Sequence, residues 1–151
     1  MQVEEIVDEY GNMLFRLCII LLCNEQDAQD AVQETFIRYM EHAPAFQGKA
    51  HEKAWLMKVA ANLCRDVYRN RMRHPTVSLD EVSKYCEMPE QNEVLMELMQ
   101  LPGKLKTVIY LHYIEGYKTT EIANMLGTTT NTVRKRLQRG RECLKLSLSE
   151  K

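Results

Sequence analysis

The stretch TTEIANMLGTTTNTVRKRLQRGRECLK, residues 119–145, decides how the C-terminal part of the chain folds. Its apolar positions and its glycine predict two helices with a tight turn between them. Thr119 or Thr120 is expected to cap the first helix, because a hydroxyl oxygen accepts hydrogen bonds from the free amides at a helix start. Gly127 is expected to end that helix, because glycine adopts the left-handed backbone conformation without steric cost.

The second helix of this stretch is predicted to begin around Thr129 or Thr130. Ala123 is small enough to let the two helices approach, and Val133 is placed to pack behind the turn. This spacing is typical of a helix-turn-helix, whose second helix enters the DNA major groove with its N-terminal residues. Arginine and lysine suit guanine edges or phosphates, and asparagine and glutamine suit adenine. The alternative is an ordinary helical hairpin with a charged outer face. The side chains expected to face DNA are Thr129, Asn131, Thr132, Arg134, Lys135, Gln138 and Arg139.

The net charge of the chain is only −1, with 20 Lys and Arg against 21 Asp and Glu. This near-neutral total is the sum of four blocks. Residues 1–47, 48–74, 75–100 and 101–146 carry net charges of −7, +5, −5 and +6. The alternation indicates two anion-binding surfaces, separated by acidic parts that have other partners. The alternative for any one block is a solvated helix face.

The composition limits the classes of protein to consider. The chain has five cysteines and no CxxC pair, which argues against a disulfide framework or a zinc ribbon. Its first ten residues, MQVEEIVDEY, are too acidic for a signal peptide. The apolar run of residues 17–23 is too short to cross a bilayer. We expect a cytoplasmic bacterial protein without membrane insertion, cofactor or metal.

The rest of the chain is predicted to be helical. Apolar residues recur at helical spacing over residues 3–21, 31–40 and 55–68, and Asp27 is expected to cap the second of these helices. A loop containing Pro44 and Gly48 interrupts the pattern. No strand-like alternation persists anywhere.

A polar, turn-rich segment divides the chain. Residues 75–90 predict a flexible linker between an N-terminal domain of residues 1–74 and a C-terminal helix-turn-helix domain of residues 91–151. The expected fold class is all-α, with two small helical domains.

The third predicted helix carries a cationic stripe opposite its apolar one, and aromatic residues alternate with lysines before it. Aromatic side chains beside cations suit single-stranded nucleic acid, because bases stack while lysines follow the phosphates. Trp55 lies on the apolar stripe and favours a core position over a stacking role. The segment 46–53 is expected to be a flexible loop. The candidate contacts to single-stranded nucleic acid are Phe46, Lys49, His51, Lys53, Lys58, Asn62, Arg65 and Arg69.

Three segments together resemble RNA polymerase sigma factors of the extracytoplasmic function (ECF) type. They are DAQDAVQETFIRYM, AFQGKAHEKAWLMKVAANLCRDVYRNRMR and LPGKLKTVIYLHYIEGYKTTEIANMLGTTTNTVRKRLQRGRECL, and they cover most of the chain in family order. The resemblance implies a first domain that binds the polymerase clamp and reads the minus-ten promoter element. It implies a second domain that binds the polymerase flap and reads the minus-thirty-five element. The family commonly has an anti-sigma factor as a further partner.

The resemblance also implies a polymerase-binding helix in the acidic N-terminal block. Its candidate contacts are Asp27, Asp30, Gln33, Glu34 and Phe36. The chain departs from the family pattern at several positions. Gln29 stands where an acidic residue is frequent, Gln47 where an arginine is frequent, and Glu52 where an aromatic residue is frequent. Thr119-Thr120 replaces a frequent Tyr-Glu pair.

Two other classes of function are open from the residues alone. One is a helix-turn-helix regulator that acts without polymerase, which would bind duplex DNA tightly by itself. The other is an enzyme or helical adaptor. The four histidines are scattered among the cysteines without the placement of a catalytic triad, and no phosphate-binding loop or HExxH motif is present. We therefore expect no catalytic residue.

Overall fold

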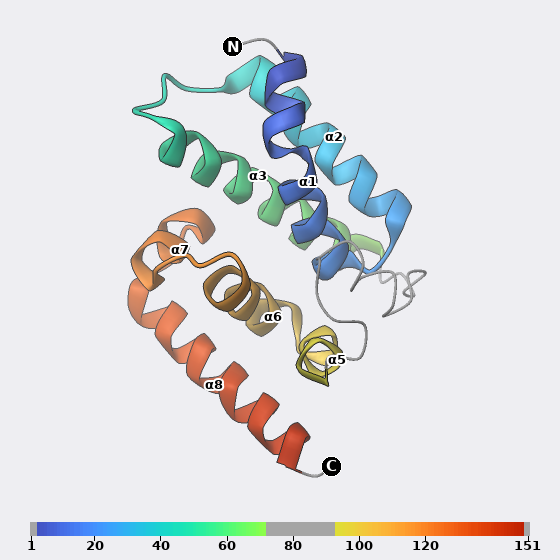
Figure 1. Ribbon diagram of the computed structural model, residues 1–151, viewed down its shortest axis with the longest axis vertical. Helices are drawn as coiled ribbons and strands as arrows, with labels where there is room; N and C mark the ends of the chain where they lie inside the picture. Colours follow the sequence, from blue (N-terminus) through green and yellow to red (C-terminus); the bar gives the residue numbers. More distant parts are fainter. Residues whose placement is uncertain (1–2, 72–92, 150–151) are drawn as a thin grey trace. The chain divides into compact units, whose positions relative to one another are not determined.

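The computed structural model describes residues 3–71 and 93–149, which form helices and short connections (Figure 1). The chain divides into two compact units, Met1–Ser78 and Leu79–Lys151. The described residues contain no β-strand, which confirms the all-α fold class. The predicted linker at residues 75–90 lies outside the described part of the chain.

The described residues of the N-terminal unit form α1 (Val3–Leu22), α2 (Glu25–His42) and α3 (Lys49–Arg71). Each of them packs on the other two. Every residue from Leu17 to Leu22 is buried, so the C-terminal end of α1 is enclosed on all sides within the core. The first half of α1 buries only one face, and Val3 and Val7 remain exposed there.

The turn between α1 and α2 is only two residues long. Cys23 adopts a positive φ of 51°, and Asn24 then caps α2. The Asn24 side-chain oxygen accepts a hydrogen bond from the Asp27 backbone amide at 3.0 Å. The prediction that Asp27 caps this helix is therefore wrong: Asn24 sits three residues earlier, where a short amide side chain reaches a free amide of the first turn.

The connection between α2 and α3 is shorter than the sequence suggests. Helix α2 ends at His42, and α3 begins at Lys49, directly after Gly48 with a φ of 132°. Lys49, His51 and Lys53 thus lie in the first turns of a helix. The predicted flexible loop over residues 46–53 is wrong in its second half, where the α3 pattern extends further toward the N-terminus than the apolar stripe shows.

The C-terminal unit consists of α5 (Glu93–Gln100), α6 (Gly103–Ile109), the π-helical turn η1 (Tyr110–Ile114), α7 (Thr119–Leu126) and α8 (Thr130–Ser149). Helix α8 packs on α5, α6 and α7. At Gly140 of α8, an added Cβ would lie 2.7 Å from Ile109 Cγ1 of α6. Glycine at this position leaves the room that the Ile109 side chain of α6 occupies.

Helices α7 and α8 form the predicted helix-turn-helix. Gly127 ends α7 with φ 66° and ψ 37°, and the Thr128 amide donates to the Ala123 carbonyl at 3.0 Å. Ala123 and Val133 are buried on either side of the turn. Thr129 accepts from the Thr132 amide at 3.1 Å, so α8 begins as expected.

The start of α7 differs from the prediction. Lys118 occupies the cap position, and its backbone amide donates to the Glu121 carboxylate at 2.9 Å. Thr119 and Thr120 already belong to the helix, so the prediction that one of them caps it is wrong. A glutamate in the first turn reaches back and supplies the acceptor instead.

Candidate nucleic-acid interface

Helix α8 presents the predicted polar face to solvent. Thr129, Asn131, Arg134, Lys135, Gln138 and Arg139 are all exposed, and Thr132 is half-buried against Thr129. Within the described residues, no acidic side chain lies within ion-pair distance of Arg134, Lys135 or Arg139. Three cations without a local counter-ion are therefore available for an external anion.

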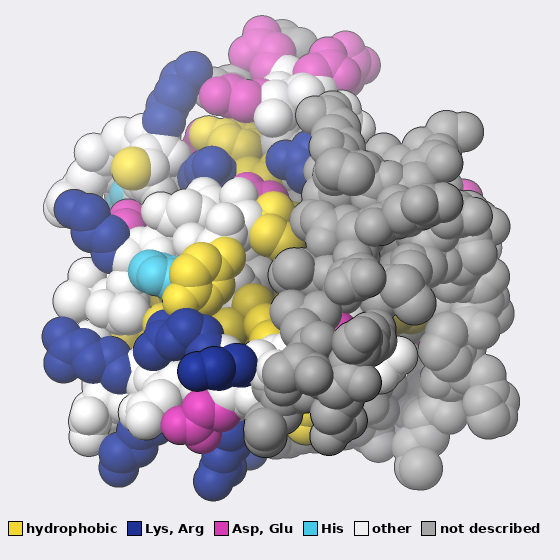
Figure 2. All heavy atoms as spheres, turned by 60° about the horizontal axis from the view of Figure 1, so that its bottom comes forward, with side chains coloured by type: hydrophobic (Ala, Val, Ile, Leu, Met, Phe, Trp, Pro, Cys, Tyr) yellow, Lys and Arg dark blue, Asp and Glu magenta, His cyan; other side chains and the backbone are white. Residues whose placement is uncertain are grey.

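The back of α8 is fixed to its own unit. Val133 and Leu137 are buried in the core, and Arg141 donates to the Tyr113 hydroxyl at 3.0 Å. Gln138 donates to Glu142 one turn further on, at 3.3 Å. Figure 2, in which the bottom of Figure 1 comes forward, shows Lys and Arg side chains gathered on the described part of that face. The helix is thus a rigid support for cationic side chains.

The N-terminal unit carries its own cationic side chains on α3. Lys58 and Arg65 are exposed, while Asn62 and Lys53 are half-buried. Lys49, at the start of the helix, forms an ion pair with Glu9 of α1 at 3.2 Å. The side chain of Arg69 lies outside the described part. The stripe from Lys58 to Arg65 therefore faces solvent as predicted, while Lys49 already has an acidic partner.

Four aromatic rings meet beside this stripe, and we call Tyr39, Phe46, His51 and Trp55 the aromatic cluster. The Phe46 ring stacks on Tyr39 with centroids 6.0 Å apart and meets the edges of Trp55 at 5.8 Å and His51 at 5.2 Å. His51 is exposed, and the other three rings are half-buried. The structure thus brings Phe46 and His51 together, and it places Trp55 at the border of the core rather than inside it.

Sequence reasoning missed Tyr39 as a member of this cluster. The helical spacing of α2 assigns Tyr39 to the apolar inner face, and the residue is half-buried there. Its centroid lies 6.1 Å from that of Trp55. The hydroxyl group on an otherwise apolar face was the one available signal that Tyr39 has a polar partner.

That partner is a buried carboxylate. Glu52 of α3 is only 7% exposed, and it accepts hydrogen bonds from the Tyr10 hydroxyl at 2.9 Å and the Tyr39 hydroxyl at 2.8 Å. Burial, followed by the hydrogen bond to Glu52, raises the pKa of Tyr10 above its ordinary range and raises the pKa of Tyr39 to about 12. Both hydroxyls are therefore neutral donors at physiological pH.

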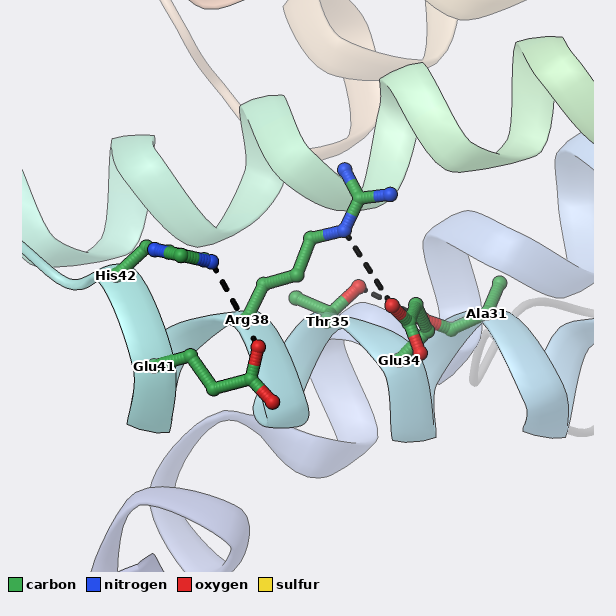
Figure 3. A network of polar contacts seen from close by, with 6 residues as sticks. All are labelled: Ala31, Glu34, Thr35, Arg38, Glu41 and His42. Atoms are coloured by element: carbon green, nitrogen blue, oxygen red, sulfur yellow. Dashed lines mark hydrogen bonds and ion pairs between the residues drawn. The ribbon is translucent and has the colours of Figure 1, made fainter.

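The candidate polymerase contacts on α2 fall into two groups. Asp30 and Gln33 are exposed and Glu34 is half-buried, whereas Asp27 and Phe36 are buried at 3% and 7% exposure. Asp27 and Phe36 thus belong to the inner side of α2 and are not part of an exposed docking surface. Figure 3 shows two ion pairs on α2. Arg38 Nε lies 3.5 Å from Glu34 Oε1, and His42 Nε2 lies 3.6 Å from Glu41 Oε2.

Other site types have little support in the described part of the chain. Its residues include no group of three His, Cys, Asp or Glu side chains that could hold a metal ion. None of the cysteines described there, Cys18, Cys23, Cys64 and Cys143, forms a disulfide. None of the described helices is long and apolar enough to span a membrane.

Comparison with known proteins identifies the two units. The family described as Sigma-70 region 2 matches residues 6–74, and the family described as Sigma-70, region 4 matches residues 91–144. The ECF RNA polymerase sigma factor SigW of Bacillus subtilis (strain 168) is 32% identical, over 97% of this chain and 88% of SigW. SigE of Mycolicibacterium smegmatis is also 32% identical, over 94% of this chain and 60% of SigE.

Solved structures agree with the sequence relatives. CnrH in complex with the cytosolic domain of CnrY is 25% identical and superposes with a TM-score of 0.72, over 98% of this chain and 88% of CnrH. The sigma factor RpoE of Bartonella quintana, in complex with the anti-sigma factor NepR, shares the fold with a TM-score of 0.74 at 18% identity, over 97% of this chain and 96% of RpoE. The chain therefore belongs to the ECF RNA polymerase sigma factors, regulatory DNA-binding proteins that bind core RNA polymerase and direct promoter-specific transcription.

Proposed function

We propose that the two units divide promoter recognition between them. The exposed face of α8 reads the minus-thirty-five element, and the aromatic cluster with the α3 stripe takes up the melted minus-ten strand. The observation that carries this division is the difference in chemistry. Unpaired cations on a helix suit a duplex groove, and clustered rings beside cations suit unstacked bases.

The assignment on α8 follows the docking geometry of helix-turn-helix proteins. Asn131, Arg134 and Lys135 lie in the first two turns of the helix, where side chains reach base edges. Thr129 and Thr132 at the helix start, together with Arg139 further along, are placed for phosphate contacts. Gln138 is the remaining candidate for a base edge.

The assignment in the N-terminal unit rests on aromatic side chains that replace the base stacking lost when the DNA melts. Opening a base pair costs a few kcal/mol, and stacking an extruded base on an aromatic side chain returns about 1–3 kcal/mol. His51 is the exposed member of the cluster, and Phe46 contacts each of the other three rings. Lys58, Asn62 and Arg65 then hold the strand, with Lys53 beside the cluster and Lys49 available once it leaves Glu9.

The exposed outer face of α2 docks on the polymerase clamp through Asp30, Gln33 and Glu34, and the C-terminal unit docks on the flap. An anti-sigma factor is a further partner, as NepR is for RpoE. The chain contributes no catalytic group, so nucleotide addition is the work of the polymerase, and the protein acts in the bacterial cytoplasm.

Reconstituted transcription tests this division. Core polymerase with the purified chain is given a promoter library, once as intact duplex and once pre-melted across the minus-ten element. We expect core-dependent initiation and higher activity on the pre-melted templates. Replacing Lys49, His51 and Asn62 by Ala lowers activity more on the duplex than on the pre-melted template. A triple variant that matches the wild type on both templates contradicts the minus-ten assignment.

The clamp assignment has its own variant. Glu34→Lys reverses a charge on the outer face of α2 and weakens binding to core polymerase in a pull-down, without loss of helicity by circular dichroism. Glu41→Lys, an exposed charge reversal on the same helix, is the matched control and retains binding. Tight, sequence-specific duplex binding by the chain alone, with no affinity for core polymerase, would instead favour a polymerase-independent regulator.

A further inference from the structure

The buried carboxylate of Glu52 on α3 connects this helix to α1 and α2. One carboxylate oxygen, Oε1, accepts from Tyr10 of α1, and the other, Oε2, accepts from Tyr39 of α2. The two donor–acceptor distances are 2.9 and 2.8 Å, and the bonded residues are 42 and 13 positions apart in the sequence. Each oxygen serves one tyrosine, so the two links can be broken separately.

The two tyrosines differ in what else they touch. Tyr10 is 5% exposed and lies in the core, whereas Tyr39 is half-buried and its ring stacks on Phe46 with an angle of 16° between the ring planes. Tyr39 also meets the edge of Trp55. The hydroxyl end of Tyr39 is therefore bound to the buried Glu52, and its ring contacts Phe46 and Trp55 of the aromatic cluster.

The hydrogen bond fixes two properties of that ring. It holds the hydroxyl toward the protein interior, so the group is not available as a donor to a base. It also fixes the hydroxyl end of the ring, and with it the χ1 torsion, while the contacts with Phe46 and Trp55 set the plane of the ring. A ring held in one orientation loses less entropy when a ligand stacks on its neighbours.

We propose that Glu52, acting through Tyr39, is a positioning residue that holds the aromatic cluster ready to receive an unstacked base of the promoter. The inference rests on the proposed function of the aromatic cluster and adds the residue that organises it. Neither Glu52 nor Tyr39 is required to touch DNA, because the buried carboxylate lies behind the ring. Recognition at the cluster is then by stacking, and hydrogen bonds to the base come from other side chains.

A matched pair of variants isolates the positioning role. Tyr39→Phe and Tyr10→Phe each remove one hydroxyl and one bond to the same carboxylate, and both keep the aromatic ring. The holoenzyme with each full-length variant is assayed on a duplex promoter and on the same promoter pre-melted across the minus-ten element. Thermal unfolding of each chain supplies the stability change.

We expect Tyr39→Phe to raise the ratio of pre-melted to duplex activity about three- to tenfold, the size of one lost hydrogen bond. Tyr10→Phe leaves that ratio at the wild-type value, although it lowers thermal stability to a similar degree. A ratio that rises equally in both variants shows that Glu52 supports the fold only and overturns the proposal. A ratio unchanged in both variants also overturns it.

Phe46→Ala separates this inference from the proposed function. If Phe46→Ala raises the ratio and Tyr39→Phe does not, the cluster binds DNA and only the positioning role is wrong. If Phe46→Ala itself leaves the ratio unchanged, the proposed role of the aromatic cluster is wrong, and the inference about Glu52 falls with it.

Discussion

On α8, the candidate contacts Arg134, Lys135 and Arg139 are separate exposed side chains on one helix. In the N-terminal unit, by contrast, the side chains of the aromatic cluster contact one another. Arg134 and Lys135 have no acidic partner among the described residues. Tyr39, by contrast, contacts Glu52, Phe46 and Trp55 at once. Substitutions on α8 are expected to act one contact at a time, and substitutions in the cluster to spread to their neighbours.

The difference suits the two forms of DNA. A duplex groove has a fixed shape, so a rigid helix with independent donors can match it. A melted strand has no fixed shape, so the protein must supply the order through a preorganised set of rings. The near-neutral total charge of −1 fits this division, because a sigma factor that bound DNA strongly alone would occupy nonspecific sites.

The largest expected effect tests whether the buried side of α8 holds the helix in place. Leu137 is 2% exposed on the inner face of α8. Leu137→Ala should lower the free energy of unfolding by about 2–5 kcal/mol, because it leaves a cavity under the inner face of α8. Chemical denaturation measures this, and Lys135→Ala on the exposed face should change the stability by less than about 0.5 kcal/mol. Equal effects would show that α8 does not depend on its core face.

The close approach of α8 to α6 predicts the next largest effect. In Gly140→Ala the new Cβ meets Ile109 Cγ1 at 2.7 Å and Cδ1 at 2.9 Å, and Ile109 is only 3% exposed. Because a buried β-branched side chain has little room to turn, overpacking should cost about 1–3 kcal/mol. Gly103→Ala is the control, since no atom lies within 4 Å of its added Cβ. A neutral or stabilising Gly140→Ala would show that α8 can shift without loss.

The independence of the α8 contacts predicts a change of sequence preference. Arg134→Ala should reduce transcription and relax the preference at one upstream base pair, at a cost of about 1–3 kcal/mol in discrimination. A library of upstream sequences measures this preference. Arg139→Ala, further along the helix, should instead weaken all sequences alike and reduce the salt dependence of binding. If Arg134→Ala also weakens all sequences uniformly, Arg134 contacts a phosphate.

The sequence alone predicted these two surfaces unequally. The helix-turn-helix follows from local features, since Gly127, Ala123 and Val133 lie within eleven residues and each has a direct steric role. The helix caps were harder, because Asn24 and Glu121 compete with nearby threonines and aspartates for the same free amides. The periodicity of apolar residues predicts which face of a helix is buried, but it does not predict which side chain caps the helix.

The bond between Glu52 and Tyr10 could not be predicted in this way. The two residues are 42 positions apart, and no pattern within one helix connects them. Glu52 was visible only as a departure from the family pattern, at a position where an aromatic residue is frequent. The partner of Tyr39 could not be predicted either. The helical spacing correctly placed its ring on the apolar face of α2, but it gave no partner for the hydroxyl.

The smallest expected effect concerns the pH dependence of the Tyr39 bond. Burial and the hydrogen bond to Glu52 raise the pKa of Tyr39 from 10.0 to about 12, so the neutral hydroxyl is favoured in the folded protein. The stabilising contribution of Tyr39 is therefore complete below about pH 10 and is lost as the pH rises toward 12.

Tyr39→Phe should cost about 0.5–1.5 kcal/mol at pH 8, the range for one hydrogen bond. The difference between wild type and Tyr39→Phe should then narrow above pH 10, because only the wild type has a tyrosine at position 39 that ionises in the unfolded chain, and this ionisation favours unfolding. Urea denaturation of both chains at pH 8, 9, 10 and about 11 measures the two curves under the same conditions. A difference that stays constant across this series would mean that Glu52 does not hold the Tyr39 hydroxyl in its neutral form. The N-terminal cluster would then consist of separate contacts, as α8 does.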